Sequence, residues 1–209
     1  MIDIFLIAVI GGAVASLLRA IHIEDRGLEA LSKAVASLGF VALGAVHLSR
    51  GNPTAGWLVG GLALCALGDV LLLRDRTFDA GLAVFLVGHI AYIVAFHMAR
   101  PIADWDLRLA AVPVVIGALA AVWLWPHLGS RRPAVTAYIV VISTMVWGAA
   151  SVAGVLGWTL AAGAVLFFLS DLTVARQRFV TADFTNRAIG LPMYYAGQVL
   201  IALSVSTGA

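Results

Sequence analysis

Apolar runs long enough to cross a membrane follow one another along most of this chain. Runs of roughly 17–22 residues, the length that spans hydrocarbon as a helix, occur eight times. We place them at residues 2–20, 32–49, 55–73, 80–98, 107–126, 134–150, 153–175 and 188–206. Helices satisfy all their backbone hydrogen bonds within one segment inside lipid. The sequence therefore predicts an all-α membrane protein with eight transmembrane helices, in a single domain over residues 1–209.

Composition leaves no room for a separate water-soluble domain. The chain is 62% hydrophobic and 11% charged, whereas soluble domains carry about 25% charged residues. Its single cysteine, Cys65, excludes an intramolecular disulfide and any CxxC metal or redox motif. The first residues lack the basic region and cleavage site of a signal peptide, so we expect a first membrane span there.

The basic residues are distributed unevenly between the connections. Ten of the 13 fall between spans 1–2, 3–4, 5–6 and 7–8, and only Arg50, Arg100 and Arg108 fall on the other side. Because cytoplasmic loops are enriched in lysine and arginine, both termini are predicted to face away from the cytoplasm. This distribution indicates topology in the cell (inner) membrane and predicts no nucleic-acid partner.

Two acidic residues lie inside apolar runs. Asp69 and Asp171 each begin the pattern D-x-x-x-x-R-x-R, and the two copies are 102 residues apart. The offset predicts a parallel repeat of four spans plus four, supported by Gly88-His89 in one half and Gly197-Gln198 in the other. With both acids five residues before an arginine, the rise per residue places them about 7–8 Å below the cytoplasmic interface.

An acid within a membrane span is a functional-site hypothesis by default. One interpretation pairs Asp69 and Asp171 with the arginines that follow them, or makes them helix caps. The other places both carboxyl groups on a common cavity, where one is ionised and the other protonated, so that they act as general acid and base. Ser170 favours an ionised Asp171 if it donates a hydrogen bond to it, and Asp69 is then the proton donor.

Other polar residues are candidates for supporting roles. Lys33 either extends to the interface or holds a phosphate at the cavity mouth. His89 and Tyr92 share a face of the fourth span, as do Tyr194 and Gln198 in the eighth.

For these four residues, hydrogen bonding between helices is the alternative to a role in the site. Asn186 lies near the cytoplasmic start of the last span, and Ser170 has the option of bonding back to its own helix. No metal-ligand spacing accompanies His89, so neither a metal nor a cofactor is predicted.

Several motifs together resemble one known family, the YhhN family of lysoplasmalogenases, and cover about residues 33 to 203. They are Gly68-Asp69, Phe78-x-x-Gly81-Leu82-x-x-Phe85-Leu86-x-Gly88-His89-x-x-Tyr92, Phe167-x-x-Ser170-Asp171 and Tyr194-Tyr195-x-x-Gln198. Tyr138, followed by Met145 and Ala149, fits the same pattern.

The resemblance implies a membrane hydrolase that cleaves the vinyl ether of lysoplasmenyl-ethanolamine or -choline without a metal or cofactor. Its partners would be a lysophospholipid substrate and membrane lipid, and a homodimer is left open. Three alternatives remain. A proton- or cation-coupled transporter would use the same acid pair, and a hydrolase of a lipid ester or amide would keep the site and change the substrate. A purely structural membrane protein would leave the two matched acids unexplained.

Overall fold

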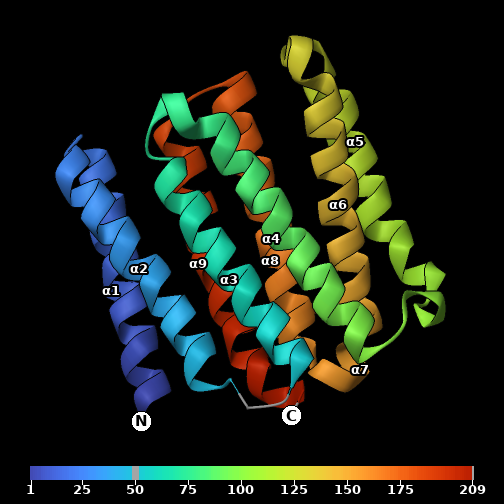
Figure 1. Cartoon of the computed structure of the whole chain (residues 1–209). Coiled ribbons are helices and arrows are strands. Elements are labelled where there is room, and N and C mark those ends of the chain that lie inside the picture. The colour runs from blue at the N-terminus through green and yellow to red at the C-terminus, as the bar shows by residue number, and fades with distance from the viewer. Residues whose placement is uncertain (49–51, 209) are drawn as a thin grey trace.

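The computed structural model describes residues 1–48 and 52–208, and this part of the chain is helical throughout, without strands (Figure 1). The long helices are α1 (Ile2–His22), α2 (Arg26–Val46), α3 (Pro53–Leu71), α4 (Phe78–Ala99), α5 (Ala111–Leu128), α6 (Arg132–Ser151), α8 (Trp158–Ala175) and α9 (Phe184–Leu203). Short 3-10 turns are Asp75–Thr77, Ile102–Asp104, Leu107–Ala110, Gly129–Arg131 and Ser204–Gly208. A four-residue helix, α7 (Ala153–Leu156), precedes α8, and a π-helical turn (Arg176–Val180) follows it.

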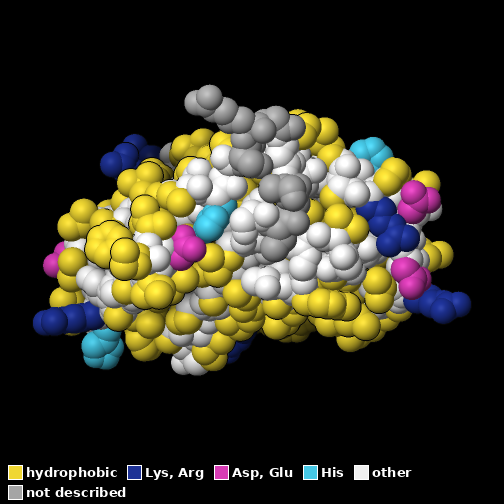
Figure 2. Space-filling model, turned by 90° about the horizontal axis from the view of Figure 1, so that it is seen from below, with side chains coloured by type: hydrophobic (Ala, Val, Ile, Leu, Met, Phe, Trp, Pro, Cys, Tyr) yellow, Lys and Arg dark blue, Asp and Glu magenta, His cyan; other side chains and the backbone are white. Residues whose placement is uncertain are grey.

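The eight long helices confirm an all-α membrane protein. Seven segments are long and apolar enough to cross a membrane, and the longest of these, Leu107–Ser151, contains both α5 and α6. The outward face of α5 exposes large apolar side chains such as Val112, Leu119 and Val122. Figure 2 shows hydrophobic side chains over most of the periphery, where lipid tails would contact the protein.

Helix boundaries differ from prediction where local caps override hydropathy. Helix α2 begins six residues before the predicted position because the Asp25 carboxylate accepts a hydrogen bond from the backbone N–H of Leu28 at 2.9 Å. The predicted seventh span is divided because Gly157 adopts φ +89°, a conformation that favours glycine, between α7 and α8. The predicted end of the second span at Ser49, and Arg50 of the charge distribution, lie outside the described residues.

The helices pack as pairs. The most extensive contacts join α3 to α4, α8 to α9 and α1 to α2. Figure 1 shows α1 and α2 on one side, α5 and α6 on the other, and the remaining long helices between them.

Glycines permit close approach in the two central pairs. A Cβ at Gly88 would lie 3.1 Å from Cys65 Sγ, and one at Gly197 would lie 2.8 Å from the Gly163 carbonyl oxygen. The presence of such glycines in both central pairs does not confirm the repeat of four spans plus four, which stays a prediction.

The connections divide between the two ends of the bundle. Those between α1 and α2, α3 and α4, α5 and α6, and α8 and α9 lie at one end, and the start of α1 and the end of α9 lie at the other (Figure 1). The first end carries the connections rich in arginine, so it is the end that the sequence predicts to be cytoplasmic.

Candidate active site

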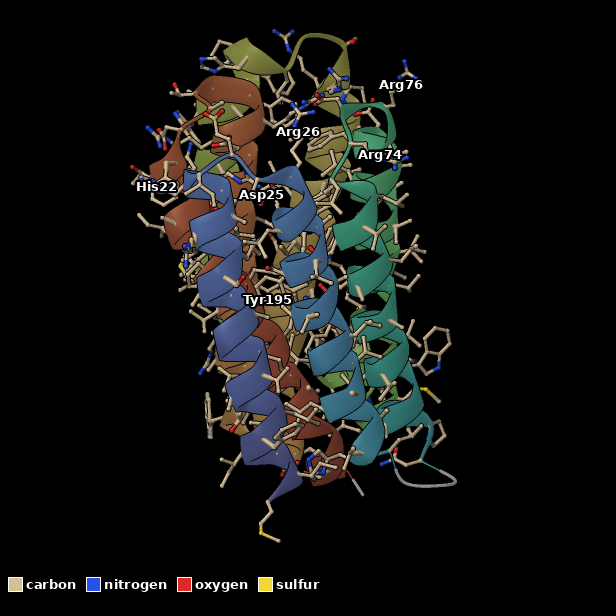
Figure 3. All side chains as sticks on the ribbon, turned by 90° about the vertical axis from the view of Figure 1, so that its left-hand side faces the viewer. His22, Asp25, Arg26, Arg74, Arg76 and Tyr195 are labelled. Carbon is tan, nitrogen blue, oxygen red and sulfur yellow. The ribbon has the colours of Figure 1, made fainter. Side chains whose placement is uncertain are left out.

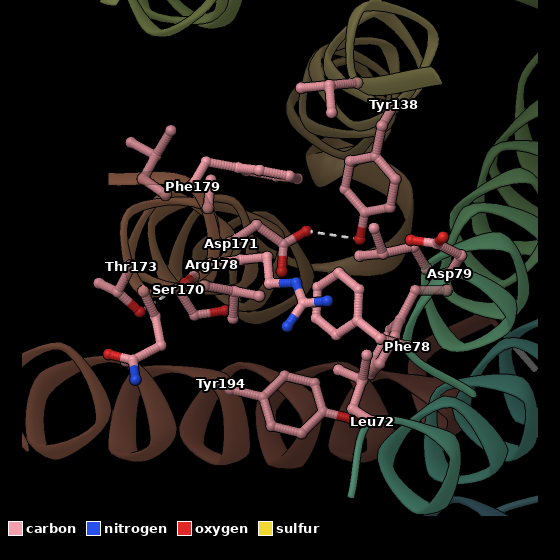
Figure 4. Close-up of a pocket in the computed structure, with 18 of the residues that line it drawn as sticks. Leu72, Phe78, Asp79, Tyr138, Ser170, Asp171, Thr173, Arg178, Phe179 and Tyr194 are labelled. Atoms are coloured by element: carbon pink, nitrogen blue, oxygen red, sulfur yellow. Dashed lines mark hydrogen bonds between the residues drawn. The ribbon is translucent and has the colours of Figure 1, made fainter. Parts of the chain in front are cut away.

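A cavity of about 1540 Å³ lies at the end of the bundle predicted to be cytoplasmic. Asp69 of α3 and Asp171 of α8 both line it, so the structure brings the two acids to one space. Figure 4 shows Asp171 and Tyr138 joined by a hydrogen bond at this cavity, with Tyr194 of α9 on its opposite side. No hydrogen bond joins the two carboxyl groups within residues 1–48 and 52–208.

Asp69 lies among hydrogen-bond donors from α2 and α9. Its Oδ1 is 3.3 Å from Lys33 Nζ. Its Oδ2 accepts hydrogen bonds from Ser37 Oγ at 2.7 Å and from Tyr194 Oη at 2.8 Å. Tyr195 Oη lies 3.3 Å from Ser37 Oγ and extends this network. An ammonium and two hydroxyl donors on one carboxyl group match the ionised form, which only accepts.

Asp171 has a different environment between α4 and α6. Tyr138 Oη donates a hydrogen bond to Asp171 Oδ2 at 2.8 Å. The same oxygen is 3.7 Å from His89 Nε2, which is too long for a hydrogen bond. The side chain of Asp171 is 18% exposed and that of Asp69 is 4% exposed, so the Asp171 side chain is the more accessible of the two.

The tautomer of His89 follows from its contact with the backbone. His89 Nδ1 lies 2.7 Å from the carbonyl oxygen of Phe85, and because a carbonyl only accepts, Nδ1 carries the hydrogen. In the neutral ring, Nε2 is then an acceptor, and it has no hydrogen-bond partner in the described part of the chain. Asp171 therefore faces an acceptor, and such a neighbour suits a protonated carboxyl group better than an ionised one.

The geometry contradicts two interpretations of these acids. In the part of the chain that the structure describes, neither Asp69 nor Asp171 pairs with an arginine of its own motif. Ser170 Oγ donates to the carbonyl oxygen of Phe167 at 2.7 Å, so it bonds back to its own helix and leaves Asp171 without the expected donor. Because Ser170 does not bond to Asp171, it does not favour an ionised Asp171 with a protonated Asp69.

Lys33 also differs from both of its predicted roles. Its side chain is only 12% exposed, so it does not extend to the interface, and its ammonium group pairs with Asp69 instead of standing free for a phosphate. Ser37, which the sequence analysis missed, is four residues further along α2. Polar residues four apart share a helix face, so this spacing was the available signal.

Tyr92 and Gln198 lie away from the cavity. Both are fully buried, and Tyr92 Oη donates a hydrogen bond to Gln198 Oε1 at 2.9 Å, joining α4 to α9. Neither residue lines the cavity, and His89 does not line it either.

Asn186 does line the cavity, where it fixes the turn before α9. Its backbone N–H donates to Asp183 Oδ1 at 2.8 Å, its amide nitrogen donates to Gln177 Oε1 at 3.1 Å, and its amide oxygen accepts from Arg176. These bonds hold the π-helical turn, a type of helix irregularity that is frequent at functional sites. Tyr138 was identified only through the family resemblance, because no local pattern marks it as a partner of Asp171.

No group of three or more His, Cys, Asp or Glu side chains suited to a metal ion occurs in the part of the chain that the structure describes. The predicted absence of a metal and of a cofactor stays a prediction.

Comparison with known proteins gives a consistent relationship. Lysoplasmalogenase TMEM86A of Bos taurus is 37% identical over 163 residues, which cover 73% of this chain and 66% of that protein. Lysoplasmalogenase TMEM86B of Sus scrofa is 36% identical over 151 residues, covering 71% and 63% respectively. TMEM86A of Homo sapiens is 36% identical over 163 residues, covering 73% and 66%.

The chain thus covers slightly less than two thirds of each of these relatives. No solved structure matches it. The YhhN family matches residues 28–205, which is most of the sequence. The chain belongs to the YhhN family.

Proposed function

We propose that this protein is a lysoplasmalogenase, which hydrolyses the vinyl ether of lysoplasmenyl-ethanolamine or -choline to a fatty aldehyde and a glycerophospho-base. One observation carries the proposal: Asp69 and Asp171 line one cavity but have different neighbours. Asp69 faces hydrogen-bond donors, whereas Asp171 faces one donor, Tyr138, and one acceptor, His89. That asymmetry provides a base and an acid in one site. The names of the relatives support the same reaction.

Protonation of carbon is the difficult step, and we assign it to Asp171. The carboxyl proton of Asp171 passes to the β-carbon of the vinyl ether, and the charge that develops on the ether oxygen and its neighbouring carbon makes an oxocarbenium ion. Tyr138 holds the carboxyl group in place through its hydrogen bond of 2.8 Å. This assignment reverses the one suggested by the sequence, because Ser170 does not bond to Asp171.

Asp69 completes the reaction as the ionised partner. Its carboxylate stabilises the oxocarbenium ion and takes a proton from the water that attacks it, giving a hemiacetal. The hemiacetal collapses when Asp69 returns that proton to the glycerol oxygen and the Asp171 carboxylate takes the hydroxyl proton. Aldehyde and glycerophospho-base leave, and both aspartates regain their starting protonation states.

The lining of the cavity fits a lysolipid. Apolar side chains from α4 and α5, among them Leu82, Leu86 and Leu124, line part of it, and arginines lie at its mouth. The single hydrocarbon chain would lie against the apolar residues, with the phosphate toward the arginines. The scissile bond would then lie between these two regions, near the aspartates.

The test is aldehyde release by the protein purified in detergent. Lysoplasmenyl-ethanolamine is supplied with a chelator, and the aldehyde is reduced at once by a soluble NADH-dependent alcohol dehydrogenase. In deuterium oxide, the resulting alcohol should carry one deuterium at the carbon next to the former carbonyl, because that carbon receives the proton.

Aldehyde from the wild type and none from folded Asp69→Asn or Asp171→Asn supports the two-aspartate mechanism. No aldehyde from folded wild type rejects the function and favours the transporter alternative, which proton-coupled uptake into vesicles would then test. Alcohol without deuterium would reject carbon protonation while leaving the hydrolase activity in place.

The location of the reaction is part of the proposal. We place the protein in the cell (inner) membrane, with the cavity toward the cytoplasm and both termini on the other side. A phosphatase reporter fused to the C-terminus is active only outside the cytoplasm, so an inactive fusion would contradict this orientation. A single domain and the absence of a nucleic-acid partner stay predictions.

A further inference from the structure

Charged side chains gather at the mouth of the cavity, and they do not balance. Arginines of the cavity lining are Arg26, Arg74, Arg76, Arg131, Arg178 and Arg187. Acids of the lining, apart from the two aspartates of the site, are Glu29, Asp75 and Asp79. Lys33 pairs with Asp69, so these two residues do not change the excess of arginines over acids.

Each of these three acids is already paired with an arginine. The pairs are Arg187 with Glu29, Arg178 with Asp75 at 2.9 Å, and Arg131 with Asp79 at 3.2 Å. The pairs connect different helices across the mouth, and they leave no acid at the mouth without a cation in the part of the chain that the structure describes.

Three arginines of the mouth remain without a partner. Arg26, Arg74 and Arg76 are exposed, and within residues 1–48 and 52–208 their guanidinium groups form no ion pair or hydrogen bond. Figure 3 shows Arg26 at the start of α2, and Arg74 and Arg76 in the connection between α3 and α4, at the same end of the bundle. Three free cations therefore border one side of the cavity.

We propose that Arg26, Arg74 and Arg76 form a subsite for the phosphate group of a lysolipid, and that the site recognises the phosphate and not the amine. Guanidinium groups bind phosphate oxygens with two parallel hydrogen bonds, so three of them suit a phosphate better than a neutral head group. An ammonium group would need a free carboxylate, and the acids at the mouth are all paired.

The consequence concerns the substrate class and rests on the proposed function. Lysoplasmenyl lipids with an anionic head group, such as a phosphate monoester, bind at least as tightly as those that carry ethanolamine. Asp171 also lines the cavity and has no cation beside it. It lies next to Tyr138 and His89 among the helices, and in the proposed function it is the proton donor.

Arginines near a membrane surface also attract anionic lipids without forming a site, and Arg19 provides the matched control. It lies on α1 at the same end of the bundle, is exposed and unpaired in the described structure, and does not line the cavity. If surface charge alone attracts the lipid, Arg19→Gln and substitutions at the cavity should weaken binding alike. If the three arginines form a phosphate subsite, only the substitutions at the cavity should weaken binding.

The experiment is a binding titration, because binding does not depend on catalysis. The full chain in phosphatidylcholine nanodiscs is titrated with three 1-alkyl probes, which have no vinyl ether: the glycerol, the glycerol 3-phosphate and the glycerophosphoethanolamine. We expect the phosphate probe to bind at least as tightly as the ethanolamine probe, and the glycerol probe to bind more weakly.

The variants locate the subsite. An exposed ion pair changes affinity a few-fold, so the variant R26Q/R74Q/R76Q should weaken binding of both phosphate probes by about tenfold to a hundredfold. The same variant should change the affinity for the glycerol probe by less than about twofold, because that probe has no phosphate to contact the three arginines. Arg19→Gln should change the affinity for all three probes by less than about twofold, because it removes no contact to any of them. Equal midpoints of thermal unfolding show that the variants fold, and Arg74→Gln alone should give a smaller loss in the same direction.

Two results would overturn the proposal: unchanged binding of the phosphate probes to the triple variant, or a clear preference for ethanolamine over the phosphate monoester. Inorganic phosphate, titrated alone, separates a lipid head group from a free anion. Binding as tight as that of the phosphate probe would overturn the head-group assignment, and much weaker binding supports it. The same proteins are assayed for aldehyde from vinyl ether lipids, so arginine-dependent binding without aldehyde rejects the proposed function and not the subsite.

Discussion

Asp69 and Asp171 have the same residue type, the same sequence motif and the same cavity, yet their surroundings are opposite. Asp69 is contacted by the ammonium of Lys33 and the hydroxyl groups of Ser37 and Tyr194. Asp171 is contacted by one hydroxyl group, from Tyr138, and faces an imidazole nitrogen that accepts. Three donors suit a carboxylate, whereas an acceptor suits a carboxyl group that carries a proton.

The difference comes from the neighbouring helices and not from the helices that carry the acids. Helix α3 packs against α2 and α9, which supply the donors to Asp69, whereas α8 packs against α6, which supplies Tyr138. A matched motif in two halves of a chain thus gives two different chemical groups once the bundle assembles. Substitutions at one acid at a time test whether the two environments differ in this way.

Removal of either acid has the largest expected effect. Proton transfer by a positioned side chain contributes about 10²–10⁴-fold to a rate, so Asp69→Asn and Asp171→Asn should each lower kcat for aldehyde release by about 10³-fold or more. The two differ in stability. Asp69→Asn leaves the partly buried Lys33 unpaired and should cost on the order of 2–4 kcal/mol, whereas Asp171→Asn leaves no unpaired charge. Thermal unfolding in detergent measures this difference.

A double variant separates stability from chemistry at Asp69. Lys33→Met with Asp69→Asn removes both charges, so it should recover most of the lost stability and none of the activity. Equal stability of the two single Asp→Asn variants would contradict the view that only Asp69 balances a partly buried cation.

Loss of one hydroxyl group on each side should have the next largest effect. Tyr138→Phe removes the hydrogen-bond donor that the described structure gives Asp171. Asp171 becomes a carboxylate as it gives up its proton, and hydrogen bonds to charged groups contribute about 1.5–3 kcal/mol, so kcat should fall by about tenfold to a hundredfold. Tyr194→Phe leaves Lys33 and Ser37 on Asp69 and should cost about threefold to tenfold. Steady-state rates of both variants check the order, and a larger loss at Tyr194 would reverse the roles assigned to the two acids.

The helices could be predicted from the sequence, and so could the two acids, because long apolar runs and intramembrane charges are local signals. The eight spans and the positions of Asp69 and Asp171 on one cavity agree with that prediction. The helix starts at Arg26 and Trp158 could not be read from hydropathy, because a capping carboxylate and a glycine conformation decide them.

The partners of the acids were harder to predict. Ser37 and Tyr138 lie 32 and 33 residues before the acid that each contacts, on a different helix from it. Local sequence does not say which residues of two helices face each other, so a hydroxyl group on another helix looks like any other polar residue in a span. The role of Ser170 failed for the same reason, because a serine next to an acid in sequence points elsewhere once both are on a helix.

His89 should show a smaller effect, and one confined to the Asp171 side. Because His89 does not line the cavity, its replacement should leave KM unchanged and alter only how the Asp171 carboxyl group is held. We expect His89→Phe to lower kcat by only about threefold, well below the roughly 10²–10⁴-fold that a group transferring the proton itself contributes. A rise in KM with kcat unchanged would show that His89 contacts substrate and would place it in the cavity wall instead.

The smallest effect on activity is expected where a buried hydrogen bond joins α4 to α9 without reaching either acid. Tyr92→Phe removes the bond from Tyr92 Oη to Gln198 Oε1 and leaves a buried amide oxygen without that donor, which costs about 1–3 kcal/mol. Unfolding of the variant should therefore occur at a lower temperature while kcat stays within about twofold of the wild type, since a bond of this kind changes stability and not the reacting groups. Gln198→Leu, together with Tyr92→Phe, should restore part of the lost stability because no polar atom of the pair then remains unpaired. If Tyr92→Phe instead lowered kcat as much as Tyr194→Phe, the bond between α4 and α9 would be setting the position of His89 or Tyr194, and the two acid environments would be coupled rather than independent.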